Sequence, residues 1–408
     1  MSAFFAQHPI LVIAVIKVVV LMFLVMTALA YLTWFERKVV AHMQSRWGPY
    51  RAGPHGLLQP LADGLKFLFK EGVTPEGADR FVYLLAPFLS LSLALTGIAL
   101  IPFGPKEIEI LGQRTPLGIA ESNIGLLFLF ALTSLGVYGV VLAGWSSNSK
   151  YSLLGGLRSS AQMVSYELSL TMSVVGVLLL AGTFNLREII AAQQGFLWGI
   201  VPRWNLFAPP LPQVLGFLCF LVSAVAETNR LPFDLAEAES ELVAGFHTEY
   251  SSFRFAMFFM GEYASMITAS CLAAILFFGG WLSPFPASPV FAWTLYIPAA
   301  LCVAGGIWLI VDGLRSSTAL GRGALPALGL ALLGAGALCM RPGVADFVQG
   351  PFWFLGKVFA FLFIYVWARG TLPRFRYDQL MAMGWKLLLP ASLANVVLTS
   401  FAMVVRQR

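Results

Sequence analysis

The chain has 408 residues, of which 58% are hydrophobic and 11% charged, whereas an average soluble domain is about 25% charged. Its mean hydropathy is +0.79, so too little polar sequence remains to cover a soluble domain of this length. The net charge is +6, but no basic stretch is interleaved with aromatic residues, and we expect no nucleic-acid partner. The composition indicates a polytopic membrane protein.

Apolar runs of the length needed to cross a bilayer, about 20 residues, recur along the chain. We expect ten spanning helices near 10–33, 81–103, 124–143, 162–182, 211–226, 260–282, 290–311, 324–340, 352–368 and 386–405. The first run is too long for a signal peptide and no basic segment precedes it, which favours a permanent span. A bilayer interior excludes open strands, so the predicted fold is all-α, with one membrane domain over 1–408.

Lys and Arg residues set the orientation of these spans. The loops 34–80, 144–161, 227–259, 312–323 and 369–385, together with Lys386, carry seventeen of them, and the other side carries seven. Cytoplasmic loops are the positively charged ones, so we expect these five loops in the cytoplasm and both termini outside.

The loop 34–80 begins with Trp34 and a charged triplet, and continues through a Gly- and Pro-rich turn into a helical stretch over 57–70. On that stretch Asp63, Lys66 and Lys70 form one polar stripe, while leucines and Phe69 supply apolar surface. The pattern predicts an amphipathic helix in the plane of the interface, with its charges facing a cavity or water. The alternative is an ordinary basic anchoring loop.

Seven of the twenty acidic residues fall within one 36-residue stretch. They are Glu227, Asp234, Glu237, Glu239, Glu241, Glu249 and Glu262. The candidate countercharges among them are Arg230, Arg254 and His247. Carboxylates at membrane depth are costly and mark proton or substrate paths. A cluster of coupled carboxyls could store protons; the alternative is a solvated acidic face on a loop.

Other polar residues lie alone in apolar surroundings. Glu167 lies in the fourth predicted span and Glu262 begins the sixth; each is either part of a proton path or a structural carboxylate bonded to Tyr or Ser. Lys17 and Lys357 are isolated within spans, where snorkelling is as good an explanation as function. We expect Tyr166 and Tyr263 to be packing or interface residues.

Several familiar chemistries have no motif here. The four cysteines, Cys219, Cys271, Cys302 and Cys339, show no metal-ligand spacing, so we predict ordinary thiols and no metal site. Nucleotide-binding and hydrolase motifs are also missing. The chain itself is therefore expected to bind neither flavin nor an iron–sulfur cluster, and any redox role needs electrons from a partner.

Four long segments resemble one family in content and order. They are ERKVVAHMQSRWGPYRAGPHGLLQPLADGLKFLFKE, AGWSSNSKYSLLGGLRSSAQMVSYELSL, ETNRLPFDLAEAESELVAGFHTEYSSFRFAMFFMGEY and RGTLPRFRYDQLMAMGWK. They are similar to the quinone-site membrane subunit of complex I, the proton-pumping NADH:quinone oxidoreductase. The resemblance covers residues 10–283 and 350–405.

The resemblance implies quinone as substrate, no complete active site on this chain alone, and a place in a bacterial inner membrane. Its implied partners are peripheral-arm quinone-site and iron–sulfur subunits, small membrane subunits, antiporter-like subunits and lipid. The quinone-binding residues carried over are Glu36, Arg37, Asp63, Lys66 and Arg230. The proton path carried over consists of Glu167, Glu227, Glu237, Glu239, Glu241, Glu249 and Glu262.

The segment 285–345 departs from the usual eight-helix pattern of the family. We expect it to be a two-helix insertion with a cytoplasmic Arg315/Arg322 turn, lying away from the quinone chamber. Ala236 stands where a proline is more typical. Two other functions stay open: a homologous component of a membrane-bound hydrogenase or ferredoxin-linked complex without quinone, and an independent secondary transporter, which often shows an internal repeat that this sequence lacks.

Overall fold

The computed structural model describes residues 9–110, 113–234, 244–286, 288–316 and 319–407. Within these ranges the chain is helical, apart from two small hairpins, β1 (Glu107–Ile110) with β2 (Gln113–Pro116) and β3 (Phe196–Leu197) with β4 (Val201–Pro202). Nine helices among the described residues are long and apolar enough to cross a membrane. The predicted all-α polytopic class is confirmed.

Each of the ten predicted apolar runs overlaps a helix. In chain order the longer helices are α2 (Pro9–Met43), α4 (Arg80–Ile98), α5 (Gly125–Ser146), α6 (Lys150–Ala181), α8 (Val214–Glu227), α10 (Ser252–Phe277), α11 (Ile297–Arg315), α12 (Ala319–Cys339), α13 (Pro342–Thr371) and α15 (Leu389–Gln407). The fifth run differs from expectation, because α8 has only 14 residues and a full span needs about 20. Short elements include α3 (Gln59–Phe69), α7 (Leu186–Ala192) and α14 (Tyr377–Met383), the last joined to α15 through the π-helical turn Gly384–Leu388.

Local sequence explains several helix ends. The Asp79 carboxylate accepts hydrogen bonds from the backbone N–H groups of Phe81 and Val82 and so caps α4, and the Asn185 side chain caps α7 in the same way. Gly182, at φ +68°, ends α6 in the left-handed conformation that glycine adopts without strain.

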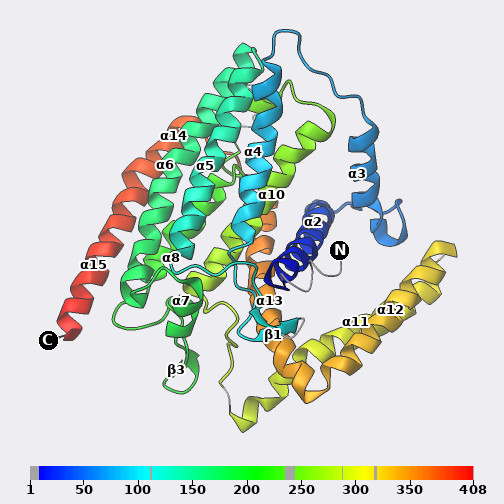
Figure 1. Ribbon diagram of the computed structural model, residues 1–408, viewed down its shortest axis with the longest axis vertical. Coiled ribbons are helices and arrows are strands. Elements are labelled where there is room, and N and C mark those ends of the chain that lie inside the picture. The colour runs from blue at the N-terminus through cyan, green and yellow to red at the C-terminus, as the bar shows by residue number, and fades with distance from the viewer. Residues whose placement is uncertain (1–8, 111–112, 235–243, 287, 317–318, 408) are drawn as a thin grey trace.

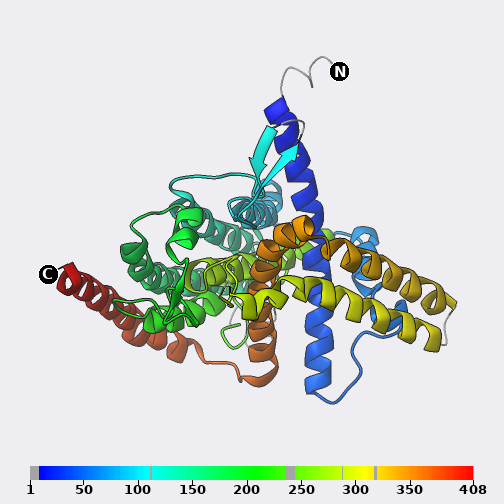
Figure 2. The same cartoon turned by 90° about the horizontal axis from the view of Figure 1, so that it is seen from below.

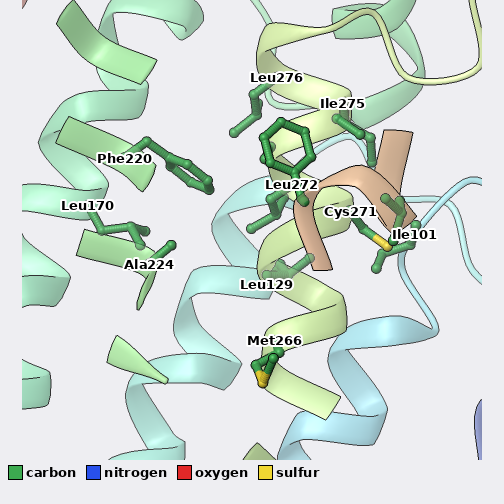
Figure 3. Packing of buried hydrophobic residues seen from close by; sticks show 14 of the residues in the cluster. Ile101, Leu129, Leu170, Phe220, Ala224, Met266, Cys271, Leu272, Ile275 and Leu276 are labelled. Carbon is green, nitrogen blue, oxygen red and sulfur yellow. The ribbon is translucent and has the colours of Figure 1, made fainter. Parts of the chain in front are cut away.

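A bundle of α4, α5, α6, α8 and α10 holds the main apolar core, shown in Figure 3. Phe220 and Ala224 of α8 lie between Leu170 of α6 and the buried face of α10 around Leu272. Helices approach closely where both carry glycine: a Cβ on Gly144 would lie 3.2 Å from the Cα of Gly156. This packing fixes the positions of the acidic residues on α6, α8 and α10.

The first helix lies apart from this bundle and crosses its direction, being foreshortened in Figure 1 and seen lengthwise in Figure 2. It packs against α13, α3 and α10. The hairpin of α11 and α12 extends to one side of the molecule, and the C-terminus lies on the opposite side in both views.

The two isolated lysines have structural roles. Lys17 donates to the carbonyls of Pro116 and Gly118 at 2.6 and 3.2 Å. Lys357 donates to the carbonyls of Phe278, Gly280 and Leu282 at 2.7 to 2.8 Å. Lys17 therefore satisfies backbone acceptors at the end of the β1–β2 hairpin, and Lys357 satisfies those of the loop that follows α10.

Candidate functional site

A cavity of about 720 Å³ lies between α2, α3, α10 and α13. Its apolar wall includes Met26 and Leu29 of α2 and Phe255 and Phe259 at the start of α10. Its polar wall consists of Glu36, Arg37, Arg46, Asp63, Tyr263 and Arg369. A largely apolar pocket of this size with a few convergent polar groups is the usual form of a small-molecule site.

One face of α3 lines this cavity. Pro60, Asp63, Gly64 and Phe67 lie at spacings of three and four residues and share that face. The Asp63 carboxylate accepts from Arg37 at 2.7 Å and from the Gln59 amide at 2.9 Å. Of the predicted polar stripe only Asp63 lines the cavity; Lys66 and Lys70 are exposed and lie outside its lining.

Glu36 is a buried carboxylate that neighbouring helices hold in place. Its side chain is 5% exposed and forms ion pairs with Arg369 and, at 3.5 Å, with Arg230. The hydroxyl of Tyr263 donates to its second oxygen at 2.8 Å, and the Arg230 guanidinium lies 4.0 Å from the Tyr263 ring centre. Removing one partner of such a buried pair costs about 3–5 kcal/mol, because the other charge is left uncompensated.

Arg230 lies between Glu36 and a second group of acidic residues, which includes Asp234 and Glu262. Its charge and that of Asp234 both act on Glu262, and Asp234 lies 3.6 Å from Arg374. Glu262 and Glu227 line a second, small cavity of about 60 Å³ with Thr228, Asn229 and Ser265 among its polar lining. Because a polar cavity needs only about 10–15 Å³ per water, this space can hold water between the two carboxylates.

Glu167 extends the same series of carboxylates. Its charge acts on Glu227, and the Ser134 hydroxyl of α5 donates to its carboxylate. The structure thus brings together Glu36, Arg230, Glu262, Glu227 and Glu167 in one sequence of neighbouring charges. The bond from Ser134 shows that Glu167 also has the structural partner that the alternative interpretation anticipated.

Other predicted residues have different surroundings. Glu237, Glu239 and Glu241 lie outside the described residues. The backbone carbonyl of Glu249 accepts from the Tyr83 hydroxyl at 2.8 Å. Arg254 donates to Thr74 at 2.7 Å, and burial lowers the pKa of His247 to about 4, so this imidazole is neutral at pH 7 and cannot serve as a countercharge.

Sequence reasoning misses two residues of the cavity. It counts Arg369 only as a cytoplasmic charge and expects Tyr263 to pack, yet both bond directly to Glu36. Arg369 is 333 positions from Glu36 in the chain, so no local spacing could relate them. Among the described residues no group of three or more His, Cys, Asp and Glu side chains could hold a metal ion.

Comparison with known proteins identifies the family. The family model described as NADH dehydrogenase matches residues 16–400. The chain belongs to this family. It is 49% identical over 389 residues to an H-type subunit of NADH-quinone oxidoreductase from Solibacter usitatus, covering 95% of this chain and 96% of that protein. It is 50% identical over 400 residues to an H-type subunit from Koribacter versatilis, covering 96% of each chain, and 45% identical over 383 residues to the one from Thermomicrobium roseum, covering 93% of each.

These family members also match across the segment that was expected to be an insertion. The alignment with the Solibacter protein leaves only a small part of either chain uncovered, which is too little to contain all of 285–345. At least part of the segment is therefore matched in that relative, and its interpretation as an insertion relative to the usual eight-helix pattern stays a prediction.

Proposed function

We propose that this chain, as the H-type subunit of an NADH-quinone oxidoreductase, forms the membrane side of its quinone chamber. The names of its relatives support the assembly. The observation that supports a quinone chamber is the 720 Å³ cavity. Its apolar wall suits an isoprenoid tail, and its charged wall suits a quinone headgroup. Peripheral-arm subunits complete the chamber and supply the electrons, since this chain carries no motif for a redox cofactor.

The charges beside the cavity support a role in proton coupling. Reduction of a quinone to a quinol takes up two electrons and two protons, and a carboxyl group near the headgroup that supplies one of these protons becomes more negative by one charge. Glu36 shares Arg230 with Glu262 through the contacts described above. A change in the charge of Glu36 therefore alters how strongly Arg230 stabilises an ionised Glu262, and the series continues through Glu227 to Glu167.

The remaining members of the proposed path rest on the family resemblance. Glu237, Glu239 and Glu241 belong to it on that ground alone, and so does Glu249, whose backbone carbonyl accepts from the Tyr83 hydroxyl. We leave Lys66 out of the proposed binding set because it is exposed and outside the cavity lining.

The contacts between loops support the proposed orientation in an inner membrane. The five loops expected in the cytoplasm are joined to one another: Ser252 donates to the carbonyls of Phe67 and Lys70, and the N–H of Asp79 donates to Ser146. Ser152 likewise bonds Phe246, the N–H of Phe375 bonds Pro232, and His55 bonds Asp312. These contacts support a common side for the five basic loops, which the positive-inside rule assigns to the cytoplasm.

Substitution of Asp63 in the purified complex tests the chamber. Asp63→Asn keeps the shape but removes the charge that pairs with Arg37, so we expect weaker binding of a quinone-site inhibitor and a lower rate of quinone reduction. NADH oxidation by ferricyanide, which bypasses the site, should be unchanged. The matched control is Lys70→Gln, an exposed position at the C-cap of the same helix and outside the lining. Unchanged inhibitor binding in Asp63→Asn would contradict the proposed quinone chamber. An equal loss of quinone reduction and of ferricyanide-dependent NADH oxidation would show a defect of assembly.

A further inference from the structure

The hairpin of α11 and α12 contacts the loop that forms one wall of the cavity. The imidazole Nε2 of His55 and the Asp312 carboxylate are 2.6 Å apart, and the His55 ring stacks on Trp308 with centroids 6.3 Å apart. Trp308 and Asp312 are four residues apart on α11 and so share one face. The sequence predicts that this hairpin lies away from the chamber. In the structure one face of α11 instead contacts the loop that contains His55.

His55 is held from several sides in a conformation that is uncommon for residues other than glycine. Its φ is +52°, and a residue with a side chain persists in this region only where its surroundings determine it. Trp34 of α2 donates to its carbonyl at 3.3 Å, and the Tyr50 ring meets the imidazole edge-on at 6.1 Å. Together with the two residues of α11, these contacts fix the position of the backbone at His55.

The backbone at His55 is coupled to the cavity wall through the next residue. A Cβ on Gly56 would lie 2.3 Å from the carbonyl oxygen of Pro49, so the two backbones are in close contact. Pro49, Gly48 and Trp47 line the cavity. A shift of His55 therefore moves Gly56 against or away from the segment Trp47–Pro49.

The helices α11 and α12 pack closely enough to make the hairpin rigid, so that it can fix the position of the loop that it contacts. A Cβ on Gly306 would lie 2.8 Å from the carbonyl oxygen of Gly329, and one on Gly313 would lie 2.4 Å from the Pro326 ring. The two helices are thus in contact along their length, and α11 and α12 also pack on α13, the helix that carries Arg369. The hairpin links α13 to the loop on the other side of the cavity.

We propose that the α11–α12 hairpin braces the mouth of the cavity, with Asp312 and Trp308 acting through His55 as positioning residues for the segment Trp47–Pro49. The brace keeps the wall in the position that admits the quinone, and neither residue touches the substrate. The proposal rests on the quinone chamber proposed above and adds the residues that set its access.

Kinetics of the intact purified complex with a short-chain quinone test the brace. Asp312→Ala and Trp308→Leu each remove one contact to His55, and we expect each to raise the KM for quinone about threefold to tenfold with kcat changed by less than about twofold. Asp312→Asn keeps a hydrogen-bonding partner for the imidazole and should restore a KM close to that of the wild type. The matched control is Asp346→Ala, an exposed acid on α13, which should have no effect.

A double substitution checks that the effect passes through His55. His55→Phe combined with Asp312→Ala should raise KM no further than either change alone, because both break the same contact. A wild-type KM in both Asp312→Ala and Trp308→Leu would overturn the brace, and so would independent effects in the double variant. Loss of assembled complex in Asp312→Ala but not in Asp346→Ala would also overturn it, since the contact would then serve folding.

The same measurements separate this proposal from the one on which it rests. If Asp63→Asn weakens inhibitor binding while the α11 variants behave as wild type, the brace alone fails. If Asp63→Asn also leaves inhibitor binding unchanged, the assignment of the cavity to quinone fails.

Discussion

His247 lies outside the spanning helices, and its burial changes its ionisation. Its side chain lies in a cage of Phe246, Phe255 and Phe259 with ring centres 4.8 to 5.9 Å away, and the residue is 4% exposed. Burial lowers its pKa from 6.5 to about 4, because the aromatic surroundings do not solvate a charged imidazolium.

This burial makes stability depend on pH. Between pH 6.5 and 4 the unfolded chain binds a proton that the folded chain does not, so stability falls as pH falls. Between about pH 7.5 and pH 5 we expect a loss of about 2 kcal/mol from this residue. His247→Phe should therefore reduce the drop in the apparent Tm of the complex over that range. The exposed His42 offers the control His42→Phe, and an equal drop in both variants and the wild type would contradict the prediction.

At the scale of residues, sequence identified the acids better than their partners. Glu36 and Asp63, which the family resemblance assigns to a quinone channel, both line the cavity; their role in binding quinone stays a prediction. Their neighbours Arg369 and Tyr263 come from α13 and α10, and only the tertiary fold brings them to Glu36. His247 was considered as a countercharge because sequence shows that a histidine is present but not that aromatic rings surround it.

At the scale of elements, apolar runs located the helices but not their ends. The first run was expected to end near residue 33, and α2 continues to Met43. The continuation is stable because its polar residues have partners there, Glu36 on Arg369 and Arg37 on Asp63. In α3 the sequence predicted the amphipathic helix, but the face toward the cavity includes Phe67 and Pro60, because α3 packs against α2 and α10 and not only against lipid.

Two glycines of α12 differ in how closely α11 approaches them, and this difference can be tested. Gly329 faces α11, where a Cβ would lie 2.6 Å from Ile310 and 2.7 Å from the carbonyl oxygen of Gly306, whereas Gly334 has nothing within 4 Å. Alanine favours a helix over glycine by about 1 kcal/mol. We therefore expect Gly334→Ala to leave the apparent Tm of the complex unchanged or raised, and Gly329→Ala to lower it by about 2–4 °C. Equal shifts in the two variants would show that the helices do not pack as described.

At the scale of the whole molecule, charge counting anticipated which loops meet, but not how the helices are arranged. The five basic loops are bonded to one another, for example through Ser252 and Phe67. Hydropathy does not predict that α2 crosses the bundle or that the α11–α12 hairpin contacts His55. An apolar run gives the length of a helix but neither its tilt nor its neighbours.

The orientation of the whole molecule in the membrane stays a prediction and can be measured. Glu71 lies in the loop before α4, which Ser252 and Arg254 contact, and Lys106 lies beyond the other end of α4, just before β1. Both residues are exposed. With Cys302 and Cys339, the partly exposed cysteines, replaced by alanine, Glu71→Cys should react with an impermeant thiol reagent in inverted membrane vesicles. Lys106→Cys should react in right-side-out vesicles, because the positive-inside rule assigns the basic side to the cytoplasm. The reverse pattern would invert the orientation of the chain, and would place the cavity mouth on the side away from the subunits that deliver electrons.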